Sequence, residues 1–158
     1  DLRRLTQQQC AHWDRLILRL EAQINAHVEA HAAVRDRVQT LCLVCGVGAH
    51  TALTLVAEFP ELGRLPPRAA AKLAGLAPLN HDSGQWQGRR HIAHGRAPVR
   101  RALFQAALVA ARHNEHLRPF YLRLRAHGKP PKVALIAVAR KLLIFLNRTL
   151  KDPPSPQP

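Results

Sequence analysis

The chain has 158 residues, of which 47% are hydrophobic, enough for one compact domain with an appendage but too few for two large domains. Its longest apolar run, residues 133–139, is much shorter than the ~20 residues of a membrane-spanning helix. Three cysteines, an odd number, do not predict a disulfide framework. Abundant Ala, Arg and Pro with little Lys favour a bacterial gene, and we expect a cytoplasmic protein.

Charge is distributed unevenly along the chain. Residues 1–61 carry six basic and seven acidic side chains, a net charge of −1, whereas residues 62–158 carry eighteen basic and three acidic ones, a net charge of +15. Nineteen of the 24 basic residues are Arg, which binds phosphate through two N–H groups at once. Such a field attracts polyanions. Nucleic acid is therefore the first partner to consider and an anionic membrane surface the second, and of the two we predict nucleic acid.

The first forty residues predict one long helix, because Pro and Gly are absent before Gly46. One face of this helix would carry residues that follow one another at alternating intervals of three and four positions. These residues, the candidate coiled-coil seam, are Cys10, Trp13, Ile17, Leu20, Ile24, His27, His31, Val34, Val38 and Leu41. This pattern indicates a coiled-coil stalk over residues 1–41 and favours a homo-oligomer. His27 and His31 could chelate a metal across a dimer, but polar seam residues that set the register are the favoured interpretation.

The stretch Gly46-Val47-Gly48 separates the end of this helix from a new helical pattern that extends to about Glu58. Two glycines around one apolar residue allow a tight turn with positive φ. The N–H groups of such a turn and of the following helix would face outward, as in a helix-hairpin-helix-like element that grips a nucleic-acid backbone. A plain helical turn is the alternative.

The rest of the chain predicts further helices and no alternating strand. A Pro- and Gly-containing linker spans residues 59–67, and helices follow over about 68–74, 98–112, 116–128 and from Pro130 or Pro131 to about 150. The last helix is expected to pack inward through Val133, Ile136, Ala137, Leu143 and Ile144. We therefore predict an all-α protein with a compact helical domain over 42–151, and a disordered tail over 152–158.

A metal site was considered for Cys42-x-x-Cys45 together with His91-x-x-His94. Two cysteines and two histidines can form a tetrahedral zinc site. The histidine spacing is shorter than in zinc fingers, however, and the two cysteines fall where a helix is expected to bury apolar side chains. Buried free cysteines commonly act as small hydrophobic residues, so no metal site is predicted.

The stretch "LNHDSGQWQGRRHIAHG", residues 79–95, contains Ser83, one of only two serines in the chain. Asp-Ser-Gly is a common turn sequence, and the glycine pattern of a hydrolase nucleophile elbow is missing. The surroundings favour another chemistry, because a serine that attacks a phosphodiester needs cations for the charge that develops on the phosphoryl oxygens. The candidate cations are Arg89, Arg90, Arg96, Arg100 and Arg101.

Several short motifs occur in a specific order: G-V-G, E-x-P-E-L-G, A-G-L-A-P, S-G-x-x-x-G-R-R, R-R-A-L and G-K-x-x-K-V-A-L. Each motif is weak alone. As a set, from about Leu41 to Lys151, they closely resemble the C-terminal transposase domain of the IS one-ten family (IS110) of bacterial insertion sequences, preceded by a stalk that resembles the family's coiled coil.

The resemblance implies a DNA recombinase that cuts and rejoins strands, with Ser83 as the nucleophile that forms a covalent phosphoserine link to DNA. Arg89 and Arg90 would orient or neutralise the scissile phosphate, and Gly84 and Gly88 would let the backbone approach DNA. The residues expected to bind the nucleic-acid backbone are Gly46, Gly48, Arg100, Arg101, Lys129 and Lys132.

The resemblance also implies partners outside this chain. In the family, an N-terminal RNase H-like domain supplies four carboxylates that bind metal, so Mg²⁺ is expected there and no cofactor is expected in this chain. A structured non-coding guide RNA and assembly into multimers are implied as well. The chain lacks the carboxylate domain and begins at Asp1 without Met, which favours a fragment, a truncated product or a remnant.

Some residues depart from the family pattern. Cys45 replaces the usual Pro before G-V-G, and His91 and His94 stand where Arg and Lys are commoner. The rival hypothesis is a non-catalytic, dimeric nucleic-acid-binding module whose salt-sensitive binding does not depend on Ser83.

Overall fold

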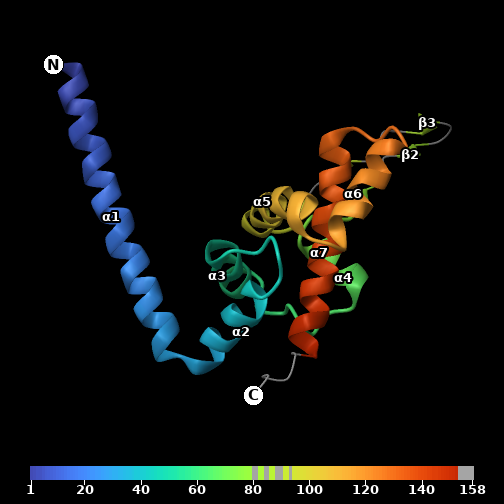
Figure 1. Cartoon of the computed structure of the whole chain (residues 1–158), viewed down its shortest axis with the longest axis horizontal. Coiled ribbons are helices and arrows are strands. Elements are labelled where there is room, and N and C mark those ends of the chain that lie inside the picture. The colour runs from blue at the N-terminus through green and yellow to red at the C-terminus, as the bar shows by residue number, and fades with distance from the viewer. Residues whose placement is uncertain (80–81, 84–85, 88–90, 93, 153–158) are drawn as a thin grey trace. The chain divides into compact units, whose positions relative to one another are not determined.

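The computed structural model describes residues 1–79, 82–83, 86–87, 91–92 and 94–152 (Figure 1). In this part of the chain it has seven helices: α1 (Leu2–Ala30), α2 (Ala32–Cys42), α3 (Ala49–Glu58), α4 (Pro67–Leu73), α5 (Ala97–His113), α6 (Leu117–Ala126) and α7 (Pro131–Lys151). Four strands of two residues each complete it: β1 (Pro78–Leu79), β2 (Asp82–Ser83), β3 (Trp86–Gln87) and β4 (His91–Ile92). The all-α class is confirmed, although the sequence did not indicate these short strands. None of the described helices is long and apolar enough to cross a membrane.

The chain divides into two compact units, Asp1–Asp36 and Arg37–Pro158. In the first unit, the prediction of one unbroken helix was wrong at His31. Its φ of −121° and ψ of 92° leave the helical region, and its Nδ1 donates to the carbonyl oxygen of His27 at 2.8 Å. The carbonyl oxygen of His31 then accepts the first hydrogen bonds of α2, from the N–H groups of Val34 and Arg35. His31 thus ends one helix and begins the next.

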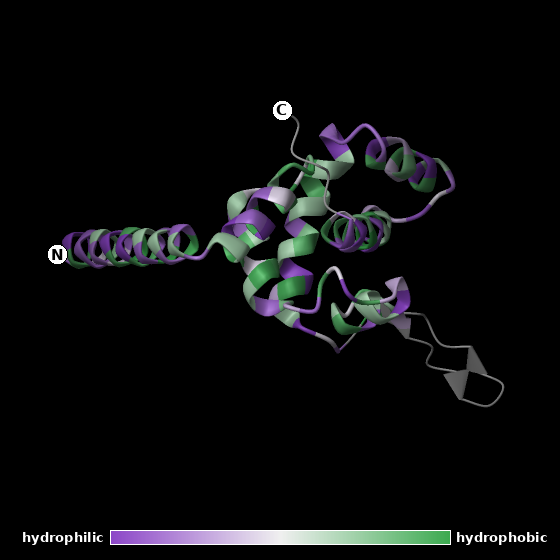
Figure 2. Ribbon diagram, turned by 90° about the horizontal axis from the view of Figure 1, so that it is seen from below, coloured by the Kyte–Doolittle hydropathy of each residue, from purple (hydrophilic) through white to green (hydrophobic). Residues whose placement is uncertain are grey.

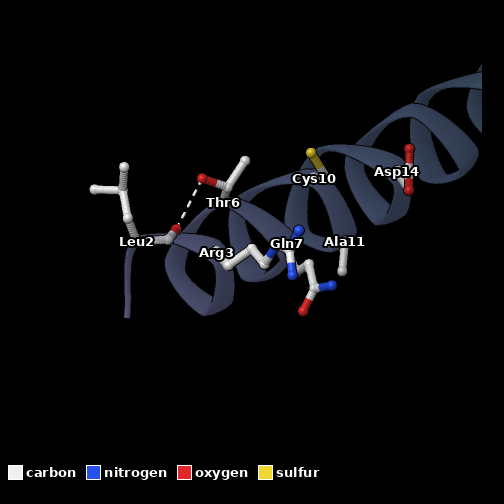
Figure 3. A pocket seen from close by; sticks show the side chains of 7 residues that line it. All are labelled: Leu2, Arg3, Thr6, Gln7, Cys10, Ala11 and Asp14. Atoms are coloured by element: carbon white, nitrogen blue, oxygen red, sulfur yellow. Dashed lines mark hydrogen bonds between the residues drawn. The ribbon is translucent and has the colours of Figure 1, made fainter.

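Helix α1 exposes an apolar stripe along the predicted seam, including Trp13, Ile17, Leu20 and Ile24, each about half exposed or more. Hydrophobic and hydrophilic residues alternate along the helix (Figure 2). A hollow lined by residues from Leu2 to Asp14 lies on a single face of α1 (Figure 3). All its lining residues come from one helix, so it is open surface. The stripe fits a partner helix, and the homo-oligomer stays a prediction.

The second unit is organised around α5 and α7 (Figure 1). Helix α5 packs against α3, α6 and α7, and α7 also packs against α4 and α6. The core includes Leu55, Phe59, Leu103, Leu142 and Leu146, all fully buried. Two residues of the predicted stalk belong to this unit, because Leu41 is fully buried in its core and Val38 packs against it. The compact unit therefore begins five residues before the predicted boundary at 41/42.

The buried face of α5 is made largely of alanines, at positions 102, 106, 107, 110 and 111. These small side chains allow the α2–α3 turn to approach closely at Gly46. A Cβ atom at Gly46 would lie 2.8 Å from Cβ of Ala110 and 3.1 Å from the carbonyl oxygen of Ala106. Only glycine fits there, since φ is also +105°.

Two buried asparagines attach loops to helices. The Asn147 amide in α7 donates to the carbonyl oxygen of Leu65 at 2.8 Å, and its oxygen accepts from the N–H of Gly63 at 2.8 Å. The Asn114 amide donates to the carbonyl oxygen of Cys45, and its oxygen accepts from the N–H groups of His116 and Leu117 at the start of α6. Both side chains satisfy backbone groups that helices and strands leave unpaired.

Helix α7 begins and ends close to its predicted limits, and of its predicted inward face Leu143 is fully buried and Ile136 packs against the core, whereas the prediction for Val133 was wrong. Val133 is 53% exposed, whereas Ala134, Val138 and Leu142 are fully buried. The error has a simple cause. An apolar run without polar interruptions contains several possible helical faces, and only the neighbouring helices select one.

We expect Asn147→Ala to lower the free energy of unfolding by roughly 2–4 kcal/mol, because it leaves the Gly63 N–H and the Leu65 carbonyl without this partner. Urea denaturation followed by circular dichroism measures the change. Gln105→Ala, at an exposed position of α5, is the matched control and should change stability by less than about 0.5 kcal/mol. Equal effects of the two substitutions would contradict the anchoring role.

Candidate functional site

The Ser83 segment is joined to the helical unit by a two-stranded stem. Strand β1 pairs antiparallel with β4, with Pro78 opposite Ile92. Ile92 is half-buried and packs against the core. Beyond this stem, β2 pairs with β3, which places the backbone of Ser83 opposite that of Trp86. The predicted serine loop over 79–95 therefore has a base that is built into the fold.

Two glycines lie back to back where the stem meets the helices. Gly75 has a φ of +68° and Gly95 has a φ of +67°. A Cβ atom on Gly95 would lie 2.6 Å from Cα of Gly75, and one on Gly75 would overlap the carbonyl oxygen of His94. The two ends of the loop can come this close only because neither residue has a side chain.

Arg96 fixes the exit of the loop to the linker that follows α3. Its guanidinium donates two parallel hydrogen bonds of 2.6 Å to the carboxylate of Glu61, and a third to the carbonyl oxygen of Glu58 at 2.9 Å. The same group lies 5.3 Å from the ring centroid of Phe59. The hydrogen bonds from Arg96 lower the pKa of the Glu61 carboxyl to about 2. This bidentate geometry is the strongest form of Arg–carboxylate pairing.

Arg100 also belongs to the stem. Its guanidinium donates to the carbonyl oxygen of His94, a residue with a φ of +60°. Arg96 and Arg100 were both candidates for binding the DNA phosphate. The structure places Arg96 in an ion pair with Glu61 and gives Arg100 a hydrogen bond at the end of the loop, and the predicted phosphate-binding role of Arg100 stays a prediction. Arg101, one residue further along α5, is exposed.

The other predicted site residues fall in separate parts of the chain. Gly46 is packed against α5, while Gly48, the residue before α3, has open space around its Cα. Lys129 and Lys132 are exposed at the connection between α6 and α7. The remaining predicted residues, Gly84, Gly88, Arg89 and Arg90, lie outside the described residues, as does His81.

In the part of the chain that the structure describes, three or more potential metal ligands do not gather, and the side chain of His91, one of the four ligands of the zinc alternative, lies outside that part. The expectation that Cys42 and Cys45 are buried was wrong, because both are exposed. Partial burial nevertheless raises the pKa of the Cys42 thiol. These cysteines flank the turn on its solvent side, since Val44 and Val47 occupy the buried positions.

A separate hollow of about 680 Å³ lies between the α2–α3 turn, the α5–α6 connection and α7. Leu43 and Phe145, both exposed, form its apolar part, and Arg148 contributes a cation. Its lining contains no residue of the stem of the Ser83 loop.

Sequence reasoning missed the two pairs that build the stem, Glu61 with Arg96 and Gly75 with Gly95. A signal was present, because Glu61 lies in the E-x-P-E-L-G motif and Gly75 in the A-G-L-A-P motif. The spacing along the chain, 35 residues for Glu61 and Arg96, gave no indication that these motifs meet the His94-Gly95-Arg96 segment in space.

Comparison with known proteins places this arrangement in a family. A family model described as transposases of the IS116/IS110/IS902 family matches residues 38–122, which include the stem and the Ser83 segment. The chain belongs to this transposase family. It is 35% identical over 135 residues to the 43.6 kDa protein of insertion element IS110 from Streptomyces coelicolor, covering 84% of this chain and 32% of that protein.

Two further relatives extend the comparison. The pilin gene-inverting protein of Moraxella bovis is 27% identical over 145 residues, which cover 89% of this chain and 45% of that protein. The 42 kDa protein of insertion element IS900 from Mycobacterium paratuberculosis is 38% identical over 99 residues, covering 61% of this chain and 23% of that protein. This member of the transposase family thus spans less than half the length of these relatives.

A matched pair of glycine substitutions tests the stem. Gly128→Ala meets a positive φ but open space, so we expect it to lower the free energy of unfolding by about 1–2 kcal/mol. Gly95→Ala meets the same strain and also the backbone of Gly75, so a further loss of about 1–3 kcal/mol is expected. Chemical denaturation gives both values. Equal losses would contradict the close approach of Gly75 and Gly95.

The ion pair gives a pH prediction. Because the folded pKa of Glu61 is about 2, below its ordinary value of 4.5, the pair's contribution to stability is complete above pH 4.5 and is lost as the pH falls toward 2. Carboxyl-carbon NMR should show Glu61 titrating near pH 2, and near 4.5 in Arg96→Gln. Arg64→Gln, at an exposed neighbouring position, is the control and should leave the titration unchanged. A wild-type midpoint near 4.5 would rule out the bidentate pair.

Proposed function

We propose that this chain is the C-terminal portion of a DNA transposase that binds DNA and supplies Ser83 as the nucleophile for strand cleavage and rejoining. One observation carries the proposal. This chain belongs to the transposase family, and a β1–β4 stem attaches its Ser83 segment to the helical unit. The close approach of Gly75 and Gly95 and the ion pair of Glu61 with Arg96 fix the base of that stem. A nucleophile must be positioned to within a fraction of an ångström, and a fixed base serves that requirement.

The proposed reaction is a phosphoryl transfer in which the number of phosphoester bonds is conserved. The Ser83 hydroxyl oxygen attacks the phosphorus of a phosphodiester and loses its proton to a base. The bond between phosphorus and one deoxyribose oxygen breaks, and that oxygen leaves as a hydroxyl after taking up a proton. Attack by a DNA hydroxyl on the phosphoserine link then rejoins the strand and restores the serine. This sequence suits recombination, because hydrolysis would lose the link.

The cations near the site have different roles in this proposal. Arg96 and Arg100 act as positioning residues, because their guanidinium groups already bind Glu61 and the His94 carbonyl. Arg101 is exposed and can reach a phosphate. Arg89 and Arg90, close to Ser83 in sequence, would neutralise charge on the phosphoryl oxygens.

Further components of the proposed enzyme lie outside this chain. On the family resemblance, Mg²⁺ would be bound by carboxylates of an RNase H-like domain. A structured guide RNA and a homo-oligomer formed through the α1 stripe are proposed on the family resemblance and, for the oligomer, on the exposed apolar residues. The net charge of +14 suits a nucleic-acid partner.

The test is covalent capture of DNA in a transposase that contains this chain joined to its N-terminal domain. The wild-type protein should form a DNA–protein adduct that survives denaturation, and Ser83→Ala should abolish the adduct without changing DNA affinity. Ser155→Ala, which removes the other serine, is the matched control and should leave the adduct intact. Mass spectrometry should locate the nucleotide on tryptic peptide 73–89, in which Ser83 is the sole hydroxyl-bearing residue.

Recombination that continues at the wild-type rate in Ser83→Ala would refute the catalytic role. Salt-sensitive DNA binding with no adduct in any variant would favour the non-catalytic module, which the concentration of positive charge beyond residue 61 also supports.

A further inference from the structure

The two helical hairpins of the second unit differ sharply in charge and exposure. The α2–α3 turn, which the sequence predicted to bind a nucleic-acid backbone, lies in a segment without Lys or Arg from residue 38 to residue 63, although α2 carries Arg35 and Arg37 before it. Its Gly46 is also occupied by contacts with α5. A phosphate approaching this turn would meet few cations, so its electrostatics do not favour DNA.

The α6–α7 hairpin has the opposite character. From residue 116 to residue 151 the chain has nine basic residues and no acidic one. Arg140 is half-buried and the other eight are exposed. None of the nine forms an ion pair with a described acidic side chain. They are Arg118, Arg123, Arg125, Lys129, Lys132, Arg140, Lys141, Arg148 and Lys151.

The turn of this hairpin is open. Gly128 has a φ of +75°, and a Cβ atom there would have no neighbour within 4 Å. The N–H of Lys129 donates to the carbonyl oxygen of Leu124, and the Arg125 guanidinium donates to the carbonyl oxygen of Lys129. The backbone is therefore fixed at the turn while the side chains of Lys129 and Lys132 are exposed.

Phe120 contacts two further cations, one from each helix of the hairpin. Arg123 of α6 lies 5.5 Å and Lys141 of α7 lies 4.5 Å from the ring centroid. Such cation–π contacts favour these positions, and neither cation forms an ion pair with a described carboxylate. Both charges can therefore pair with a phosphate.

We propose that the α6–α7 hairpin, through Lys129, Lys132, Arg123 and Lys141, binds the phosphate backbone of duplex DNA independently of sequence. The inference rests on the proposed function and assigns its backbone contacts to this hairpin instead of the G-V-G turn. Lys132 and Lys141 are nine residues apart, about 14 Å along the helix and half a turn around it, so the four cations are spread over the hairpin and do not form one compact pocket. Successive phosphates of a duplex strand rise by about 3.4 Å, so the surface suits a polymer with several phosphates better than a free anion.

The test compares two double charge reversals that change the net charge equally. Lys129→Glu/Lys132→Glu alters the hairpin, and Arg64→Glu/Arg68→Glu alters two exposed arginines of the same unit outside it. Fluorescence anisotropy with a labelled duplex at several salt concentrations measures affinity, and circular dichroism checks folding. The hairpin variant should lose at least about tenfold in affinity, and its logarithmic salt slope should decrease by about 2, for two lost phosphate contacts. The control should lose less than about threefold.

A third variant examines the G-V-G turn directly. Gly48→Asp fits open space at the residue preceding α3, where Asp is a favoured helix cap. We expect its DNA affinity to stay within about twofold of the wild type. A large loss there, with an unaffected hairpin variant, would return the backbone contact to the G-V-G turn and overturn the proposal.

Other outcomes of these measurements also test the assignment of the backbone contacts to the α6–α7 hairpin. Equal losses in both double variants would mean that net charge alone controls binding and would overturn the hairpin assignment. A hairpin variant that loses affinity for duplex RNA but not for DNA would contradict the choice of partner. Wild-type binding that the hairpin variant leaves unchanged would overturn this inference but not the transposase proposal, whereas a wild-type chain without salt-dependent DNA binding would contradict both.

Discussion

The arrangement of the second unit depends on the alanine face of α5. A helix can contact several neighbours at once only if its side chains let their backbones approach, and Ala106 and Ala110 admit the α2–α3 turn at Gly46. Helices α6 and α7 pack against other parts of α5. Because α5 begins immediately after Arg96, the same helix also fixes where the Ser83 loop returns to the body of the protein. The position of the candidate site is thus a consequence of core packing.

The cations of the second unit fall into two groups, those with partners at the stem of the loop and those without a described carboxylate partner on the α6–α7 hairpin. Arg96 and Arg100 hold the stem of the loop, and their positive charges are directed to Glu61 and to the His94 carbonyl. The cations of the α6–α7 hairpin have no such carboxylate among the described residues. Unpaired exposed cations contribute little to stability, and they remain available for phosphates. The proposed backbone contacts and the proposed nucleophile thus involve different residues, which substitutions can change separately.

Several features could be read from the sequence. Turn residues at Gly46, Gly128, Pro98 and the Pro130-Pro131 pair predicted where helices end and begin, and the observed α5 and α7 agree within about two residues, the usual uncertainty of helix ends. The motif order predicted the family, which the comparisons confirm. Other features were not predictable. His31 interrupts a helix without Pro or Gly, Val133 points to solvent from a uniformly apolar run, and Cys42 and Cys45 are exposed.

The sequence by itself determined the helical class, the approximate limits of the helices, the concentration of positive charge beyond residue 61 and membership of a transposase family. These properties depend on composition, local turn chemistry and motif order, all of which act over short distances in the chain. Only the tertiary structure decided that Glu61 meets Arg96, that Gly75 meets Gly95, and that Gly46 faces α5 while Gly128 faces open space. Such pairings follow from how α5 and α7 bring distant segments together, because contact between residues far apart in sequence is set by packing and leaves no local pattern to read.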